Sequence, residues 1–342
     1  MKSEKEQVKN FEKILPDKSI QYPSCDWIEG GLVFKEDCIT ACCVSFEGGG
    51  QPKLADYRNA GELPVEEIIQ SRNQIIYDNQ NGGHAACRNC SRLESKIWEE
   101  RSYIFDKILF NHFNVCNVSC IYCFEIKRKI IPADKVPMLL PIIKELIDNR
   151  QLMSGSNIYF GGGEPTILPE FEDLYSLLTS HGSRFTIFSN AVKFSKAIEE
   201  SLQADLVDTL LISPDAATNS VFKMIKRVDK CDQVWKNITR YIKASPEKTW
   251  PKIIFMSENV CEAVPFMERA EKSGATHVVY DVEVSMEEVS ESIIQAAAAI
   301  ILEGKKRGIT TIRGEAGINY RPNAKIPDRI DQCVETILAG EE

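Results

Sequence analysis

The cysteines are the residues of this chain whose spacing points most directly to chemistry. The 342 residues include 12 cysteines, and Cys116, Cys120 and Cys123 form the run C-x-x-x-C-x-x-C within FNVCNVSCIYCF. Closely spaced thiolates favour zinc or an iron–sulfur cluster. Three of them can hold a [4Fe–4S] cube and leave one iron open to a ligand. The spacing alone also allows a zinc knuckle with a distant fourth ligand, or buried thiols.

A glycine turn lies one strand–helix unit further along. The segment YFGGGEPT, residues 159–166, directly follows an apolar run that predicts a strand. Consecutive glycines allow a ligand to approach the backbone closely. Glu164 adds a carboxylate suited to an ammonium group. The pairing of this turn with the cysteine run indicates a cofactor site at the carboxyl ends of parallel strands.

A second group of cysteines lies near the N-terminus. Cys25, the adjacent Cys42 and Cys43, and the C-x-x-C of Cys87 and Cys90 can form a four-thiolate site. Four thiolates suit either zinc or a second iron–sulfur cluster. Cys43 is an alternative to Cys42, because successive strand residues face opposite sides and only one of the two can point to a shared metal.

Alternating strand and helix patterns must position these residues. Short apolar runs predict buried parallel strands, and amphipathic stretches between them predict helices. Three of the predicted helices are followed by a glycine, namely Gly182, Gly274 and Gly308. Six such repeats indicate an α/β fold with right-handed crossovers, either a partial barrel or an open sheet. The predicted strands are 104–113, 157–160, 184–188, 209–212, 252–256 and 277–282. The predicted helices are 63–77, 137–149, 168–180, 193–203, 232–243, 262–273, 286–307 and 330–338.

Composition and texture set the expected organisation. We expect a leader at 1–20, a cysteine-rich module at 21–100, the α/β domain at 101–313 and a tail at 314–342. The formal charge of −9 argues against nucleic acid as a partner, since phosphate is bound by cationic groups. The sequence has neither a membrane-length apolar run nor a signal-peptide pattern, and its cysteines cluster like metal ligands. We therefore expect a cytoplasmic protein with no membrane partner.

The cysteine run and the glycine turn together resemble the radical S-adenosylmethionine (SAM) superfamily. The resemblance covers roughly residues 103–310 and implies a partial (β/α)6 barrel. It also implies that Cys116, Cys120 and Cys123 hold a [4Fe–4S] cluster whose open iron binds the amine and carboxylate of SAM. The order of the N-terminal cysteines resembles a SPASM-type module, which implies a second, auxiliary [4Fe–4S] cluster on Cys25, Cys42, Cys87 and Cys90.

The family pattern also implies which residues contact SAM. Tyr122 would lie near the adenine, and Glu164 would receive the methionyl ammonium. Either Lys226 or Arg227 would face the SAM carboxylate. The remaining cofactor contacts that the resemblance implies are Gly161, Gly162 and Gly163 in the turn, Ser189 and Asn190 near the ribose, and Ser213 and Asp215 after the fourth strand.

The resemblance implies radical chemistry, with an electron donor such as flavodoxin or ferredoxin. Reductive cleavage of SAM would give methionine and a 5′-deoxyadenosyl radical that abstracts hydrogen from the substrate. We expect a polar small molecule (a sugar, aminocyclitol or nucleotide sugar) to be oxidised or epimerised. A ribosomally made peptide, epimerised or cross-linked, is the alternative. An iron–sulfur electron carrier or a zinc-stabilised binding protein is the non-enzyme alternative.

Cys231 bears on the fate of the substrate radical. It precedes a predicted helix, and a thiol on the cavity side would return hydrogen in an epimerase. The other interpretation of Cys231 is a small buried apolar residue. The sequence leaves the substrate, the oligomeric state and the electron donor undetermined.

Overall fold

The computed structural model describes residues 19–43, 50–56, 63–88, 90–99, 101–123, 136–283, 288–314 and 325–340. The chain divides into two compact units. The first consists of Met1–Phe113, Ile131–Gly162 and Glu172–Arg184, and the second of Asn114–Ile130, Gly163–Phe171 and Phe185–Glu342. The predicted leader lies almost wholly outside the described residues, and the predicted domain bounds stay predictions.

The first unit carries most of the N-terminal cysteine region and the first two strands of the α/β domain. Its described strands are β1 (Gln21–Ser24), β2 (Gly31–Phe34), β3 (Cys38–Thr40), β4 (Lys53–Asp56), β5 (Glu94–Ile97), β6 (Phe105–Phe110) and β7 (Leu152–Phe160). Its helices are α2 (Asp26–Gly30), α3 (Val65–Gln80), α4 (Leu140–Asp148) and α5 (Phe171–Ser180), which begins one residue before the unit does.

The sheet of the first unit runs in the order β7-β6-β2-β3-β4. The β7–β6 and β6–β2 pairs are parallel, and the two pairs beyond β2 are antiparallel. The rings of Phe34, Phe110 and Phe160 continue across the three parallel strands, with centroids 5.8 Å and 5.0 Å apart. Strands β1 and β5 form a separate antiparallel pair.

The second unit holds the remaining parallel strands and their helices. Its strands are β8 (Arg184–Ser189), β9 (Val207–Ile212), β10 (Thr249–Phe255), β11 (His277–Val282) and β12 (Thr310–Arg313). Its helices are α6 (Lys196–Gln203), α7 (Asn219–Lys226), α8 (Cys231–Ala244), α9 (Ala263–Ser273), α10 (Glu291–Arg307) and α11 (Ile326–Gly340), with 3-10 turns η3 (Pro165–Ile167) and η4 (Ser257–Glu262).

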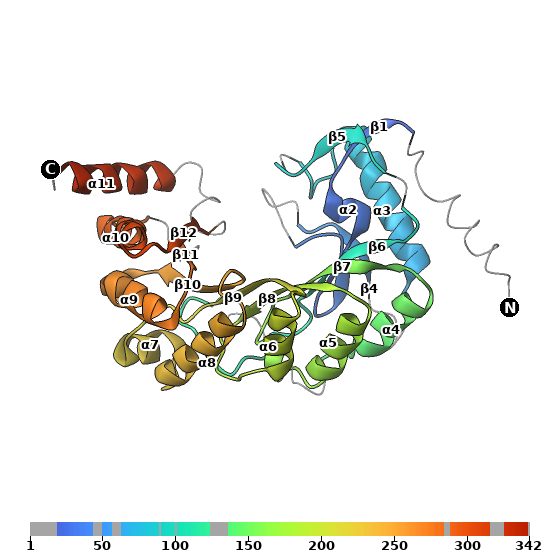
Figure 1. Ribbon diagram of the computed structural model, residues 1–342. Helices are drawn as coiled ribbons and strands as arrows, with labels where there is room; N and C mark the ends of the chain where they lie inside the picture. The colour runs from blue at the N-terminus through green and yellow to red at the C-terminus, as the bar shows by residue number, and fades with distance from the viewer. Residues whose placement is uncertain are drawn as a thin grey trace. The chain divides into compact units, whose positions relative to one another are not determined.

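The strands β8 to β12 are consecutive and parallel throughout. Helices α6, α8 and α9 lie along one side of them (Figure 1). Burial alternates along β8 and β10, as in β8, where Ile187 is fully buried and Phe188 is 43% exposed. One face of this sheet is therefore covered by helices, and the other carries half-exposed side chains.

The predicted α/β fold class, a partial (β/α)6 barrel, is confirmed. The six predicted strands of the domain correspond to β6–β11, with β11 at the predicted bounds. Gly182, Gly274 and Gly308 follow helix ends with φ of 80°, 82° and 67°, as expected for C′ glycines. The sequence patterns missed α7 and β12, and the four residues of β12, TTIR, include a single large apolar side chain. Among the described residues, no helix is long and apolar enough to cross a bilayer.

Candidate functional site

The three-cysteine loop follows β6 and is held by the end of α7. The backbone N–H of Ser119 donates to the Lys226 carbonyl at 3.1 Å, and that of Ile121 donates to the Ile225 carbonyl at 3.0 Å. Cys120 lies between these two bonds, so its backbone is fixed on both sides. Cys120 and Cys123 are half-buried and Cys116 is exposed.

The glycine turn 161–163 needs glycine at two positions. Gly162 has a φ of +82°, and a Cβ there would lie 2.5 Å from the Phe113 carbonyl oxygen. A Cβ on Gly163 would overlap the Val115 carbonyl, which accepts the N–H of Glu164 at 2.9 Å. Side chains are excluded because the turn runs against the backbone that leads into the cysteine loop.

Glu164 is a buried carboxylate, 1% exposed. It accepts hydrogen bonds from Thr166 Oγ1 at 2.7 Å, Ser189 Oγ at 2.8 Å and the backbone N–H of Asn190 at 2.7 Å. Burial raises its pKa, and these hydrogen bonds act in the opposite direction. Within the described part of the chain, no ion pair forms with Glu164. Because a buried charge is costly without a counter-charge, this carboxylate suits a cationic ligand.

Asn190 joins the glycine turn to the cysteine loop. Besides its backbone bond to Glu164, its side-chain Nδ2 donates to Cys116 Sγ at 3.4 Å and to Asn117 Oδ1 at 2.7 Å. Although the Cys116 residue as a whole is exposed, partial desolvation of its thiol raises the pKa to about 11, and the bond from Asn190 opposes the shift. The residues predicted after β8 therefore do meet the residues predicted after β6.

Asp215 is fully buried, with a φ of +57°. One carboxylate oxygen accepts the Ile254 N–H at 2.8 Å; the other accepts the Tyr122 hydroxyl at 2.5 Å and pairs with the Lys226 ammonium. Ser213 is half-buried, and its N–H donates to the Ser189 carbonyl at 3.2 Å. The carboxylate of Asp215 is thus occupied by protein partners.

Of the two cations predicted to face the SAM carboxylate, Lys226 is buried in the protein and Arg227 is exposed to solvent. The Lys226 side chain is 2% exposed, whereas Arg227 is exposed and ends α7 in a left-handed conformation with φ of 62°. The assignment of Arg227 to SAM stays a prediction.

The N-terminal cysteines come from three separate elements. Cys25 precedes α2, and Cys87 and Cys90 lie in the turns after α3. Burial raises the pKa of the Cys87 thiol to about 11, and the thiols of Cys25 and Cys90 are close enough to add to that shift. Cys42 is half-buried and Cys43 is exposed, and the choice between them as the ligand stays a prediction.

A metal or cluster has suitable donors in both places. Among the described residues, no three His, Cys, Asp or Glu side chains gather closely enough for a single ion. A four-iron cube separates its thiolate ligands more widely than one ion does. Three loop thiols beside a buried carboxylate without a counter-charge fit a cluster with an amino-group ligand. The three N-terminal thiols fit a second cluster with one further ligand.

Cys231 begins α8 and is 2% exposed. Its thiol lies 3.5 Å from both the Ala217 carbonyl oxygen and Arg269 Nη1, and burial raises its pKa to about 11. The structure therefore surrounds it with protein, as in its interpretation as a small buried residue.

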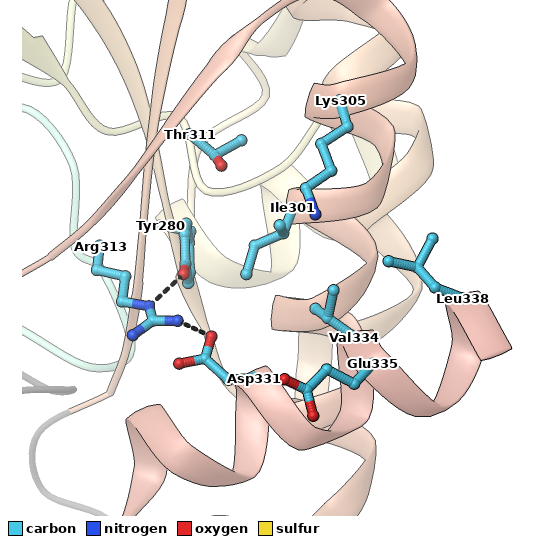
Figure 2. Close-up of a pocket in the computed structure, with 9 residues that line it drawn as sticks. All are labelled: Tyr280, Ile301, Lys305, Thr311, Arg313, Asp331, Val334, Glu335 and Leu338. Carbon is cyan, nitrogen blue, oxygen red and sulfur yellow. Dashed lines mark hydrogen bonds and ion pairs between the residues drawn. The ribbon is translucent and has the colours of Figure 1, made fainter.

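A separate pocket of about 370 Å³ lies in the second unit and contains none of the predicted site residues (Figure 2). Arg313 crosses it, donating to the Tyr280 hydroxyl at 2.9 Å and pairing with Asp331 of α11. The positive charge of Arg313 in this pocket is thus already neutralised by Asp331.

Comparison with known proteins agrees with this geometry. The model of the radical SAM superfamily matches residues 110–270. Mycofactocin maturase MftC of Mycobacterium tuberculosis (strain ATCC 25618 / H37Rv) is 27% identical over 162 residues, which are 47% of this chain and 40% of that protein. GTP 3',8-cyclase of Clostridium botulinum (strain Okra / Type B1) is 27% identical over 127 residues, 36% of this chain and 40% of that protein.

Among solved structures, Streptococcus suis SuiB is similar with a TM-score of 0.48 and 13% identity, over 78% of this chain and 58% of SuiB. The chain spans about 40% of the length of the curated relatives it matches. Residues 110–270, which hold the cysteine loop, the glycine turn and the ends of β8 and β9, are thus similar to a radical SAM domain.

Sequence reasoning missed two supports of the site. Thr166 holds the Glu164 carboxylate, and Lys193 Nζ in turn donates to the Thr166 carbonyl at 2.6 Å. A threonine two residues after a glutamate is a signal that could have indicated the first contact. The second support is α7, whose end holds the cysteine loop.

Proposed function

We propose that this chain is a radical SAM enzyme that cleaves S-adenosylmethionine and modifies a peptide substrate. Cys116, Cys120 and Cys123 would hold the SAM-binding [4Fe–4S] cluster. When bound, this pair of cofactors supplies the reducing electron and the radical that removes hydrogen from the substrate. The observation that carries the proposal is Glu164, a buried carboxylate without an ion-pair partner in the described chain, next to the three-thiol loop.

The chain's own residues would bind and orient SAM. Glu164 would accept the methionyl ammonium while Ser189 and Asn190 keep its oxygens in place. The turn Gly161–Gly163, free of side chains, would let the methionyl group lie against the backbone. Asn190 would also donate to the sulfur of Cys116 and so fix that ligand relative to Glu164.

We further propose that the N-terminal thiols of Cys25, Cys42, Cys87 and Cys90 hold a second [4Fe–4S] cluster in a SPASM-like module. The proposal is supported by the proximity of the thiols of Cys25, Cys87 and Cys90, which influence one another electrostatically. Four thiolates would leave this cluster without an open iron, which suits an electron acceptor or relay. A flavodoxin or ferredoxin would supply the electrons, and the expected location is the cytoplasm.

The substrate class is where the comparisons change the expectation from the sequence. A sugar-type substrate was the first expectation, and a peptide was the alternative. The relatives named maturases support the peptide, because maturation means the modification of a precursor. The peptide therefore takes first place, and oxidation, epimerisation and cross-linking are the outcomes that product analysis separates.

Anaerobic assays test the proposal. Reconstituted, dithionite-reduced protein should convert SAM to 5′-deoxyadenosine, and the Cys116→Ala/Cys120→Ala/Cys123→Ala variant should not. Cleavage that survives in this variant contradicts the proposal. Short peptides encoded beside the gene, incubated with the active enzyme, should lose a hydrogen pair or, in deuterated water, gain one deuterium. Turnover of nucleotide sugars but of no such peptide overturns the substrate class alone.

A Cys231→Ala variant tests the role of that thiol in the same assay. Its burial against Ala217 and Arg269 leads us to expect unchanged product and unchanged deuterium incorporation. Loss of the deuterium label with SAM cleavage intact would make Cys231 the hydrogen donor.

A further inference from the structure

Lys226 is a buried cation at the end of α7. Its ammonium pairs with Asp215, donates to the Tyr122 hydroxyl at 3.1 Å and lies 5.3 Å from the centre of the Tyr122 ring. Its side chain is 2% exposed. Asp215 is fixed in turn, because the side chain of Asn259 donates to its carbonyl at 2.9 Å and the Ile254 N–H to its carboxylate. The charge of Lys226 therefore has one defined place.

That place adjoins the middle cysteine of the loop. The Lys226 and Ile225 carbonyls accept the N–H groups on either side of Cys120. The Lys226 side chain reaches the same loop, because its ammonium donates to the hydroxyl of Tyr122, two residues after Cys120, at 3.1 Å. Backbone and side chain of Lys226 thus both contact the loop on either side of Cys120.

These contacts suggest a task other than the binding of the SAM carboxylate expected for a cation here. The Lys226 ammonium is already paired with Asp215, and it lies buried against the loop that carries the three thiols. A positive charge or hydrogen bond at a cluster sulfur favours the more negative, reduced cluster, because it stabilises the added electron. The Asp215–Tyr122 network prevents the ammonium from moving elsewhere.

We propose that Lys226 is a positioning residue that raises the reduction potential of the cluster bound by Cys116, Cys120 and Cys123. This inference rests on the proposed function, since it needs the cluster to be there. Asp215 and Tyr122 serve it by holding the ammonium beside the cysteine loop.

The test is an EPR-monitored redox titration of the reconstituted, SAM-free protein. A Cys25→Ala/Cys87→Ala/Cys90→Ala background removes the signal of any N-terminal cluster. In Lys226→Gln, the ratio of reduced to oxidised cluster at a fixed potential should fall about tenfold, which is about 59 mV for one electron. Lys226→Arg, which keeps the charge, should restore the potential. Lys223→Gln, on the same helix but exposed and paired with Asp229, should leave it unchanged.

The variant Asp215→Asn should shift the reduction potential in the opposite direction. It also provides a test if Lys226→Gln fails to fold. Asparagine keeps an acceptor for the Ile254 N–H and removes the charge that neutralises Lys226. The potential should therefore rise in this variant. A structural role alone would lower cluster content in both variants without moving their potentials in opposite directions.

Three results overturn the inference. One is an unchanged potential in Lys226→Gln with normal iron content. Another is weaker SAM binding in Lys226→Gln at an unchanged SAM-free potential, which would make Lys226 a ligand of SAM. The last is a potential that falls in Asp215→Asn. Failure of the proposed function looks different, because the background protein would then form no cluster that depends on Cys116, Cys120 and Cys123.

Discussion

The two cysteine groups of this chain are built in opposite ways. The loop at Cys116–Cys123 is a single short segment, and its supports come from distant positions: α7 holds its backbone and Asn190 contacts its first thiol. The N-terminal thiols are brought together from separate elements, with Cys25 before α2 and Cys87 after α3. The first arrangement allows a cluster with an open iron near the buried Glu164 carboxylate, whereas the second would tie separate elements together. This difference fits the proposal of a catalytic cluster at the first group and a relay or structural cluster at the second.

Removing each group of thiols in turn gives the largest expected effect. With Cys116, Cys120 and Cys123 changed to Ala, SAM cleavage should fall to background. With Cys25, Cys87 and Cys90 changed instead, about four of about eight irons per chain should remain and SAM cleavage should persist. Iron and sulfide analysis with a 5′-deoxyadenosine assay measures both. Equal loss of cleavage in the two variants would erase the distinction between the sites.

Removing the charge of Glu164 should have the second-largest effect, on the affinity for SAM. Glu164→Gln keeps a side chain that can accept hydrogen bonds but loses the attraction to an ammonium, about 1.5–3 kcal/mol for a charged hydrogen bond. SAM binding should weaken about 10- to 100-fold, as measured by equilibrium dialysis.

Glu262 offers a matched control for this change. It is also a 1% exposed carboxylate, and it accepts the backbone N–H of Thr218 at 2.9 Å. Glu262→Gln should leave the affinity for SAM unchanged while lowering stability. Equal weakening in both variants would mean that burial of a charge, rather than the site, sets the affinity.

The glycine turn should show a smaller effect, on stability. Gly162→Ala places a Cβ at a φ of +82° and 2.5 Å from the Phe113 carbonyl oxygen, which should cost about 1–3 kcal/mol. At Gly161, the nearest atom to such a Cβ is 3.5 Å away, so Gly161→Ala should cost little. Urea unfolding of the two variants measures the difference, and equal midpoints would contradict the geometry.

The pH dependence of stability should change least. Burial raises the pKa of Cys231 from 9.0 to about 11. The unfolded chain therefore ionises first as pH rises, and the free energy of unfolding should fall between about pH 9 and pH 11. Cys231→Ala should remove about 1 kcal/mol of this fall, after allowance for partial solvation. Cys261→Ala, at an exposed thiol, is the control. A fall of the same size in Cys231→Ala and in the unmodified protein would refute the assignment.

The parts of the molecule that the sequence could predict are those with a local signal. Buried apolar runs such as His277–Val282 give a strand at its observed bounds, and the glycines after the helices mark their ends. The cysteine loop and Glu164 follow from spacing and residue type. The short pair β1–β5 has no such signal, because its sequences, QYPS and ESKI, are brief and mixed in polarity.

The contacts that the sequence could not predict depend on long-range packing. Tyr122 and Asp215 are 93 residues apart, and only the fold brings the hydroxyl to the carboxylate. A lysine next to an arginine usually indicates a solvated surface, yet Lys226 is buried and Arg227 is not. The conformation of α7, which ends between them, decides which of the two cations faces inward.

Asn190 has a consequence for how the molecule tolerates thermal motion. Its backbone N–H donates to Glu164 and its side chain donates to Cys116. A displacement of the end of β8 should therefore move the sulfur and the carboxylate together. The distance between the Cys116 sulfur and the Glu164 carboxylate should therefore change little when the sheet fluctuates. A ligand that binds at both groups would then meet a constant separation.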